Sequence, residues 1–261
     1  MIDPVAIQIG PIPIYWYGII MMSAFILGTA LAYRQAALSG LNPEHILNML
    51  ILIIPVSIVC ARIYYVIFSW SDYRLDPLEA LAVWHGGLAI HGGLIGGVLA
   101  GYFYVKKHKL DFWSMGDIFA PGIILGQAIG RWGNFINREA YGGPVSPDFI
   151  SRFPAFIQDQ MFIGGRYNHP TFLYESAWDL LVFVFLLAAG RRNKVPGQIL
   201  LLYLGLYSAG RFFIEGMRTD SLMLGPARVA QLVSLILIVT AAAGIFYRRR
   251  KVKTQQDHIF P

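Results

Sequence analysis

Seven long apolar segments, separated by short polar ones, constrain this chain more than any other feature. They cover residues 15–33, 45–69, 87–105, 115–136, 170–189, 197–214 and 226–247. A helix needs roughly 20 mostly apolar residues to cross the hydrocarbon core of a bilayer. Because lipid offers no hydrogen-bond partners, only helices and closed barrels can span it. The apolar runs are continuous and do not alternate with polar residues, so the sequence predicts helices.

The composition agrees with a membrane protein. Apolar residues make up 56% of the 261 residues and charged residues only 14%, whereas soluble domains usually carry about 25% charged residues. We therefore expect an all-α integral membrane protein with seven transmembrane helices, forming one membrane domain over residues 1–261. Asp3 stands where a signal peptide carries a basic region, so we expect the first span to stay in the membrane.

Lysine and arginine indicate the orientation. These residues concentrate in the cytoplasmic loops of membrane proteins. Basic blocks follow the third, fifth and seventh spans, at residues 106–109, 191–194 and 248–253. Seven spans place all three blocks in the cytoplasm, with the N-terminus outside and the C-terminus inside, as in a bacterial inner membrane. Topology thus accounts for the net charge of +6, and we expect no nucleic-acid partner.

One of the segments on the outer side is long. Residues 137–169 contain turn-forming glycines and prolines, but also apolar side chains such as Phe149, Phe153 and Ile157. Loops of this length are usually either functional or disordered, and the apolar side chains argue against disorder. The sequence predicts a small ordered cap between spans four and five, on the periplasmic side.

Ionisable side chains interrupt four of the predicted spans at a similar depth near the outer side. These side chains are Arg62, His91, Arg131 and Arg211. A charge inside a bilayer costs a few kcal/mol or more, so such residues are candidates for function. Snorkelling of each long side chain to the headgroups is the alternative, and it stays open for Arg62.

The richest surroundings are those of Arg131, in the stretch Gly130–Glu139. Asn134 and Asn137 lie three residues apart and share a helical face, and Glu139 follows. A planar guanidinium group binds phosphate through two parallel hydrogen bonds. The stretch therefore predicts a site for a phosphodiester.

Two further motifs belong to the same set. Tyr207, Arg211 and Glu215 are spaced four residues apart, so Glu215 can hold the arginine by an ion pair along the helix. His91 lies among closely spaced glycines, and histidine can act as a base near neutral pH. We expect Tyr207 and Glu215 to contribute to substrate binding.

Other chemistries lack their motifs. The six histidines and Cys60 have no metal-ligand spacing, and no HExxH motif occurs. The chain contains no G-x-S-x-G elbow, P-loop or GxGxxG sequence. We expect no metal and no other cofactor.

The residues from Gly130 to Glu139 resemble the signature of the prolipoprotein diacylglyceryl transferase family, G-R-x-G-N-F-x-N-x-E. The remaining motifs of the family match in the same order. They are Tyr15-Trp16-Tyr17-Gly18, His91-Gly92-Gly93-Leu94, His169-Pro170 with Tyr174-Glu175, and Gly210-Arg211-Phe212. The likeness extends from Gly10 to about Glu215, and the seven-span layout fits it as well.

The resemblance implies transfer of the diacylglyceryl group of phosphatidylglycerol to the lipobox cysteine of a prolipoprotein, with formation of a thioether and release of glycerol 1-phosphate. It implies that Arg131 and Arg211 handle the phosphate, with Asn134 nearby. It also makes His91 the catalytic histidine and gives Tyr17 and Gly142 importance to the site. The expected partners are phosphatidylglycerol, the signal peptide of a prolipoprotein, and the membrane itself, and we expect a monomer.

The chemistry of the residues supports the same reaction. Only a few per cent of an ordinary thiol is ionised at pH 7, and a base such as His91 or a cationic field from the arginines would raise that fraction. The competing hypothesis is a phospholipid flippase or a lipid-binding membrane protein without catalysis. It is disfavoured because no inverted repeat is visible, a feature that many transporters carry.

Overall fold

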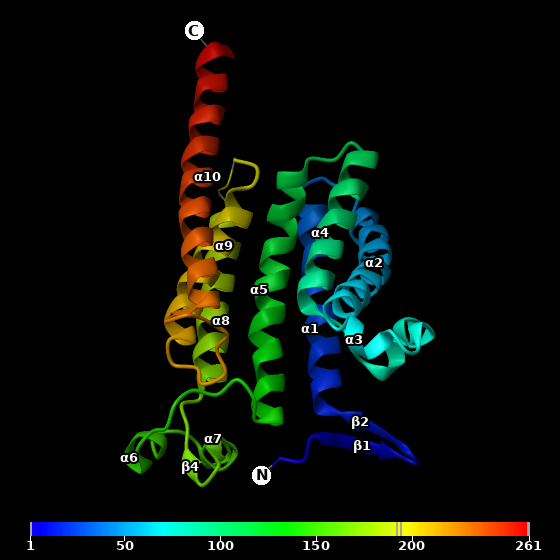
Figure 1. Ribbon diagram of the computed structural model, residues 1–261. Helices are drawn as coiled ribbons and strands as arrows, with labels where there is room; N and C mark the ends of the chain where they lie inside the picture. The colour runs from blue at the N-terminus through cyan, green and yellow to red at the C-terminus, as the bar shows by residue number, and fades with distance from the viewer. Residues whose placement is uncertain (1, 192, 194, 260–261) are drawn as a thin grey trace. The chain divides into compact units, whose positions relative to one another are not determined.

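The computed structural model describes residues 2–191, 193 and 195–259. Seven long helices run through these residues (Figure 1), and each coincides with one predicted apolar segment. They are α1 (Trp16–Leu38), α2 (Glu44–Phe68), α4 (Ile90–Lys107), α5 (Phe112–Asn137), α8 (Thr171–Gly190), α9 (Gln198–Glu215) and α10 (Val229–Ile259). Arg192 and Lys194, which belong to the basic block after the fifth segment, lie outside the described residues.

Four of the helices are long and apolar enough to cross a bilayer by length and composition. They are α1, α2, α8 and the Val229–Val252 part of α10. The helices α4 and α9 are shorter, with 18 residues each, and α5 contains Asp117 and Arg131. A multi-pass helical membrane protein with four clear apolar spans follows from the structure.

The chain divides into two compact units, and each is described by itself. One comprises Met1–Ala32 and Gly116–Pro261, and the other comprises Tyr33–Met115. The helices α1 and α5 each contribute residues to both units.

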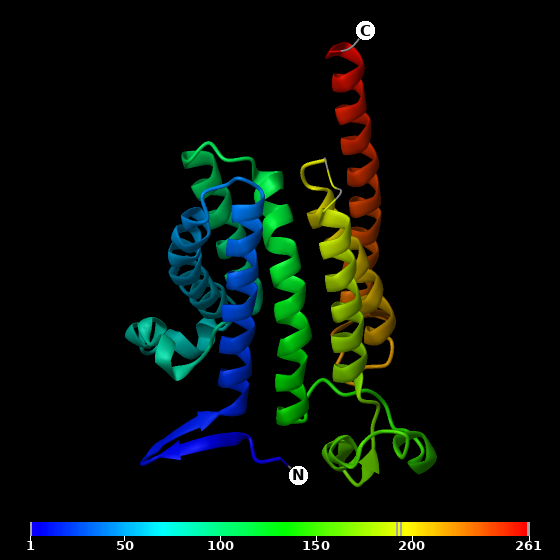
Figure 2. The same cartoon turned by 180° about the vertical axis from the view of Figure 1, so that it is seen from behind.

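In the first unit, α5 lies between α1 on one side and α8 and α9 on the other (Figures 1 and 2). The backbones of α1 and α5 meet at Gly28 and Gly122. A Cβ atom on Gly28 would lie 2.9 Å from the carbonyl oxygen of Gly122, and one on Gly122 would lie 2.5 Å from that of Gly28. Two glycines at one level are therefore what permits this close helix contact.

The other side of α5 packs into a core with α8 and α9. The buried members are Ala120, Ile124, Val182, Leu186, Ile199 and Tyr203. Asp117 completes the contact, because its carboxylate accepts hydrogen bonds from the backbone N–H groups of Gly197 (2.7 Å) and Leu200 (2.8 Å). These donors at the start of α9 have no partner within their own helix, so α5 supplies one.

The segment predicted to be a cap is ordered and follows α5. It contains the short helices α6 (Pro147–Ile150) and α7 (Ala155–Met161) and the hairpin of β3 (Phe162–Ile163) and β4 (Arg166–Tyr167). Ile150, Ile157 and Met161 pack with Phe135 and Phe172 from the flanking helices. Its apolar side chains thus form a small core that extends the end of α5.

Two hairpins complete the first unit. The strands β1 (Val5–Ile9) and β2 (Ile12–Tyr15) pair antiparallel before α1, and β5 (Met223–Leu224) pairs with β6 (Ala227–Arg228) before α10. The backbone N–H of Ile2 donates to the side-chain oxygen of Gln160 in α7 at 3.0 Å. Both hairpins and the cap lie at the same end of this unit (Figure 1).

The second unit is built on the helix pair α2 and α4. Gly96 of α4 faces Cys60 of α2, and a Cβ atom there would lie 2.5 Å from the Cβ of Cys60. The segment that connects the two helices in sequence contains α3 (Trp70–Tyr73) and the 3-10 turns η1 (Pro77–Leu81) and η2 (Val83–His85). Cys60 is thus a packing residue in this contact.

Arg62 of α2 binds this connecting segment through hydrogen bonds. Its guanidinium group donates to four backbone carbonyls, at distances from 2.7 to 3.2 Å. The acceptors belong to Glu79, Ala80, Gly86 and Gly87. The side chain also lies 5.1 Å from the ring centre of Tyr73, and the residue is only 5% exposed. These contacts favour a structural role for Arg62 over the substrate-binding role that we predict from its position in the second apolar segment.

We expect Arg62→Met to loosen the segment from residue 76 to residue 89. The apolar side chain keeps the packing of the stem but removes hydrogen bonds from a charged donor, which contribute about 1.5–3 kcal/mol each. Amide hydrogen exchange in this segment should then accelerate by at least about tenfold to a hundredfold, the factor that loss of one such bond gives. Arg74→Met, at an exposed arginine just before this segment, serves as the control. Unchanged exchange in Arg62→Met would contradict the structural role.

Candidate active site

The first unit holds a cluster in which one carboxylate pairs with two guanidinium groups. Glu175 of α8 lies 2.9 Å from Nε of Arg131 on α5 through Oε2, and 2.7 Å from NH1 of Arg211 on α9 through Oε1. The Glu175 side chain is 5% exposed, so water screens these ion pairs only weakly. A single carboxylate thus fixes the guanidinium groups of two different helices. We call Arg131, Glu175 and Arg211 the arginine cluster.

The sequence brings α8 and α9 close enough for this pairing through one glycine. Gly210, directly before Arg211, lies against the indole of Trp178, and any side chain there would overlap that ring. The indole N–H of Trp178 donates to the carbonyl of Leu206 at 2.9 Å. The indole thereby fills the place that a side chain on α9 would take.

A second indole joins α8 to α5. The N–H of Trp132 donates to the hydroxyl of Ser176 at 3.2 Å, and that hydroxyl donates to the carbonyl of Ala128 at 2.9 Å. Trp132 and Ser176 are the immediate neighbours of Arg131 and Glu175 in sequence. The hydrogen bonds therefore fix the register in which the arginine meets the glutamate.

The predicted ion pair along α9 forms. NH2 of Arg211 lies 2.7 Å from Oε2 of Glu215. Beyond it, Arg218 lies 3.9 Å from Glu215 and donates two hydrogen bonds to Asp220, at 2.9 and 2.7 Å. The guanidinium of Arg218 lowers the pKa of Asp220 below its ordinary value. The cluster thus continues into the loop after α9.

Two predicted residues of the signature also join the cluster. Asn134 accepts a long hydrogen bond of 3.3 Å from NH1 of Arg131 and donates to Glu139 at 2.8 Å. In the part of the chain that the structure describes, NH2 of Arg131 and Nε of Arg211 donate no hydrogen bond. Each guanidinium group therefore keeps a donor for a ligand while its other nitrogens are held in place.

Gly142 lies where the cap meets the loop after α9. Its backbone N–H donates to the carbonyl of His169 at 3.0 Å, and it pairs with Arg218 in an isolated β-bridge. A Cβ atom would lie 2.7 Å from that of His169 and 3.0 Å from Thr171. Burial lowers the pKa of His169. Only glycine fits this contact, and through the bridge it positions the loop that carries Arg218.

A buried acid lies one turn beyond Glu175. Asp179 is 2% exposed, and among the described residues its Oδ2 has no hydrogen-bond partner. It interacts electrostatically with Arg131 and Arg211, as does Tyr207 on α9. The predicted residue Tyr207 therefore lies beside the arginine cluster, next to an acid that the sequence pattern did not single out.

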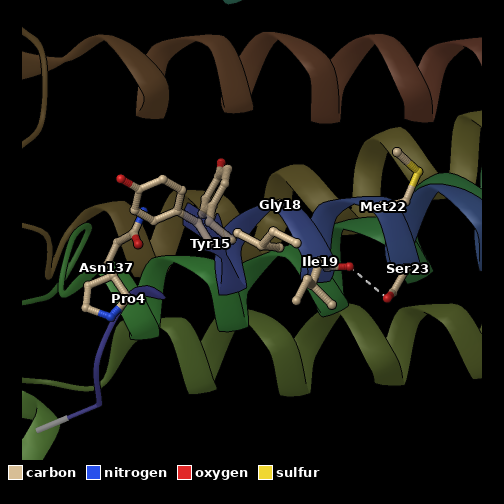
Figure 3. A pocket seen from close by; sticks show the side chains of 9 residues that line it. Pro4, Tyr15, Gly18, Ile19, Met22, Ser23 and Asn137 are labelled. Carbon is tan, nitrogen blue, oxygen red and sulfur yellow. Dashed lines mark hydrogen bonds between the residues drawn. The ribbon is translucent and has the colours of Figure 1, made fainter. Parts of the chain in front are cut away.

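Tyr17 and Asn137 lie at a cavity of the first unit of about 800 Å³ (Figure 3). The lining is mostly apolar and comes from the N-terminal segment, the start of α1 and the end of α5. It consists of Pro4, Ile14, Tyr15, Tyr17, Gly18, Ile19, Met22, Ser23 and Asn137. The ring of Tyr17 also packs on Gly133, where a Cβ atom would be 2.8 Å away. Asn137 thus lines this cavity, while Asn134 pairs with Arg131 and Glu139.

The second unit holds His91 in the first turn of α4. The residue is exposed, and its ring centre lies 6.1 Å from that of Tyr64 on α2. The ring nitrogens make no hydrogen bond with any described residue, so both are available to a ligand. His85, a few residues earlier, pairs instead with Glu79 at 2.5 Å.

The structure therefore brings together Arg131, Asn134, Glu139, Tyr207, Arg211 and Glu215, and it adds three residues to them. The additions are Glu175, Asp179 and Arg218. Glu175 stands in the Tyr174-Glu175 motif, and Asp179 follows it by four residues, so a polar face of α8 was visible in the sequence. No group of three metal-ligating side chains occurs among residues 2–191, 193 and 195–259.

Comparison with known proteins gives one family. The sequence model of the prolipoprotein diacylglyceryl transferase family matches residues 4–247. The chain is 48% identical over 263 residues to the phosphatidylglycerol–prolipoprotein diacylglyceryl transferase of Halalkalibacterium halodurans. This alignment covers 100% of this chain and 91% of the relative. It is 52% identical over 253 residues to the protein of that name from Geobacillus kaustophilus, covering 96% and 94%. It is 49% identical over 262 residues to that from Bacillus licheniformis, covering 98% and 97%.

Proposed function

The chain belongs to the prolipoprotein diacylglyceryl transferase family and has that family's transferase activity, and we propose that the arginine cluster is where the reaction takes place. The donor is phosphatidylglycerol, and the acceptor is the lipobox cysteine of a prolipoprotein. The observation that carries this proposal is the buried carboxylate of Glu175, which holds Arg131 and Arg211 together. The arrangement suits a phosphodiester because each guanidinium group retains a donor.

The reaction displaces a phosphate. The cysteine sulfur attacks the CH2 carbon of the diacylglyceryl group that is bonded to the phosphate oxygen, a sulfur–carbon bond forms, and the bond between that carbon and the oxygen breaks. The electron pair of the broken bond leaves on glycerol 1-phosphate. Guanidinium groups that are already fixed beside the departing oxygen stabilise its growing charge without reorganisation. Glu175 and Glu215 supply that fixation for Arg211, and Glu175 and Asn134 supply it for Arg131.

The thiol proton needs an acceptor, and we assign this role to His91. Neutral imidazole accepts a proton near pH 7, and the exposed ring at the start of α4 has both nitrogens available. A cationic field alone also promotes ionisation of a thiol. A base and the two arginines would therefore act in the same direction.

Tyr17 and Asn137 would bind another part of a substrate. They line the cavity of about 800 Å³, whose walls are mostly apolar. Such walls suit hydrocarbon, and the phenol and amide add the few polar groups that orient a ligand. Gly142 acts indirectly, by holding the loop of Arg218 against the cap.

The proposed topology has seven spans, with the N-terminus and the active site on the outer side and the C-terminus in the cytoplasm, and the enzyme acts as a monomer. Both hairpins and the cap gather at one end of the first unit (Figure 1). The basic end of α10 lies at the other, where Arg249 donates to Gln198 at 3.0 Å. This separation agrees with the distribution of lysine and arginine.

The direct test is transfer to a synthetic peptide that contains a lipobox cysteine. We expect the purified protein, given vesicles of phosphatidylglycerol, to add one diacylglyceryl group to this peptide, as seen by mass spectrometry. A peptide with serine in place of the cysteine should stay unmodified, because its hydroxyl is not ionised at neutral pH. Transfer that persists when vesicles contain only phosphatidylcholine would refute the proposed donor.

A further inference from the structure

We propose that the Lys107 end of the α2–α4 pair binds the headgroup of an anionic phospholipid. The site is a cavity of about 300 Å³ inside the second unit, which we call the α2–α4 pocket. It is lined by Asn48, Leu52, Phe103, Tyr104, Lys107 and His108. The two helices that form it pack side by side (Figure 1).

The polar part of the pocket has a rigid frame. Tyr104 is 7% exposed, and its hydroxyl lies 3.0 Å from Nδ1 of His45. The ring of His108 packs on that of Tyr104 with centres 4.3 Å apart and planes inclined by 30°. The ring of His45 meets His108 edge-on, with centres 5.4 Å apart. The rings of Tyr104 and His45 thus both contact the ring of His108, which follows Lys107 in sequence.

The charge around the pocket suits an anion. Lys106, Lys107 and Lys109 lie in one run of four residues, and all three are exposed. Two acids lie near it in sequence: Asp111, whose carboxylate accepts hydrogen bonds from the backbone N–H and the hydroxyl of Ser114 at 2.7 Å, and Glu44, one turn before Asn48. Lys107 is the one lysine of the pocket lining and can donate to a phosphate beside the amide of Asn48, while Lys106 and Lys109 lie outside the lining.

The apolar part of the pocket distinguishes a lipid from a soluble phosphate. Leu52 and Phe103 are 39% and 61% exposed, and both stand on helices that the sequence assigns to the membrane. An acyl chain would cover these side chains while its phosphate reaches Lys107. A soluble phosphate would leave them uncovered. The amphipathic lining therefore favours a phospholipid.

This site is separate from the transferase chemistry. Lys107 and His91 lie at opposite ends of α4, roughly 24 Å apart along the axis at 1.5 Å per residue. Under the proposed topology the α2–α4 pocket faces the cytoplasmic leaflet, whose anionic lipids attract basic segments at the membrane surface. A lipid bound there would stay bound to the enzyme and would not serve as the donor of the diacylglyceryl group.

The experiment uses the full-length protein in phosphatidylcholine vesicles that contain a small fraction of phosphatidic acid with a photoreactive acyl chain. After illumination, mass spectrometry of the digested protein should place cross-links on the peptides of Leu52 and Phe103. We expect Lys107→Gln to lower the cross-link yield there by about fivefold, because it removes the one lysine that lines the pocket. The matched variant is Lys109→Gln, which removes the same charge outside the pocket and should lower the yield by less than twofold.

Three results would overturn the proposal. They are an equal loss in both variants, cross-links spread evenly over the apolar helices, and competition by soluble glycerol phosphate as effective as competition by unlabelled phosphatidic acid. Peptide transfer is measured on the same preparations and should be unchanged in Lys107→Gln. A failure of lipid binding with normal transfer would therefore count against this site alone and not against the proposed function.

Discussion

Arg131→Lys and Arg211→Lys should each lower the rate of diacylglyceryl transfer by at least about a hundredfold. Each arginine contacts a carboxylate and a second partner at once, and Arg211 joins Glu175 to Glu215. The ammonium group of lysine is a point charge and cannot replace a planar fork. Loss of one fixed donor at a developing negative charge typically lowers kcat by 10²–10³-fold.

The measurement is the initial rate of peptide modification with phosphatidylglycerol vesicles. Arg152→Lys, at an exposed arginine of the cap, is the matched control and should keep the wild-type rate. Turnover within a few-fold of wild type in either cluster variant would show that a simple positive charge suffices, and the assignment of the arginine cluster would then be wrong.

The second large effect concerns Glu175, which we expect to act by positioning the arginines. Glu175→Gln keeps the shape of the side chain but leaves two guanidinium groups without their shared carboxylate. We expect kcat to fall by about 10- to 100-fold, because the fork geometry is no longer enforced. The KM for phosphatidylglycerol should not rise, since removing a negative charge favours an anionic substrate.

The kcat per folded molecule, measured together with KM, separates positioning from a merely structural role. Loss of structure would lower the amount of folded protein and leave the KM of the remainder unchanged with a normal kcat per folded molecule. The control is Asp148→Asn, at an exposed acid of the cap, which should change neither constant. A KM that rises together with a fall in kcat would contradict the positioning role.

The helices were predictable because their signal is local. Each apolar segment is continuous over at least 18 residues, so its helix can be read without knowledge of any contact. The pairs Arg211–Glu215 and Arg131–Asn134 were within reach for the same reason, since residues three or four apart meet on any helix.

Contacts between helices could not be obtained in this way. Glu175 lies 36 residues from Arg211 in sequence, and nothing in the spacing shows that it pairs with two arginines. The same limit explains Arg62, whose depth suggested a ligand site while its partners are carbonyls of a segment well separated in sequence. Asn134 and Asn137 share a face by spacing, yet one turns to the cluster and the other to the cavity, because their neighbours differ.

Asp117 has a consequence for the electrostatics of α9. Its carboxylate meets the positive end of the α9 dipole at Gly197, whereas Arg211 lies in the last turns of the helix, where the dipole is negative. Many proteins bind phosphate at a helix start, where backbone N–H groups attract it. Here the phosphate would meet a carbonyl end instead, and Arg228 already donates to the carbonyl of Glu215 at 2.8 Å. The cations at this end must therefore outweigh the field of the helix itself before they can attract a lipid headgroup.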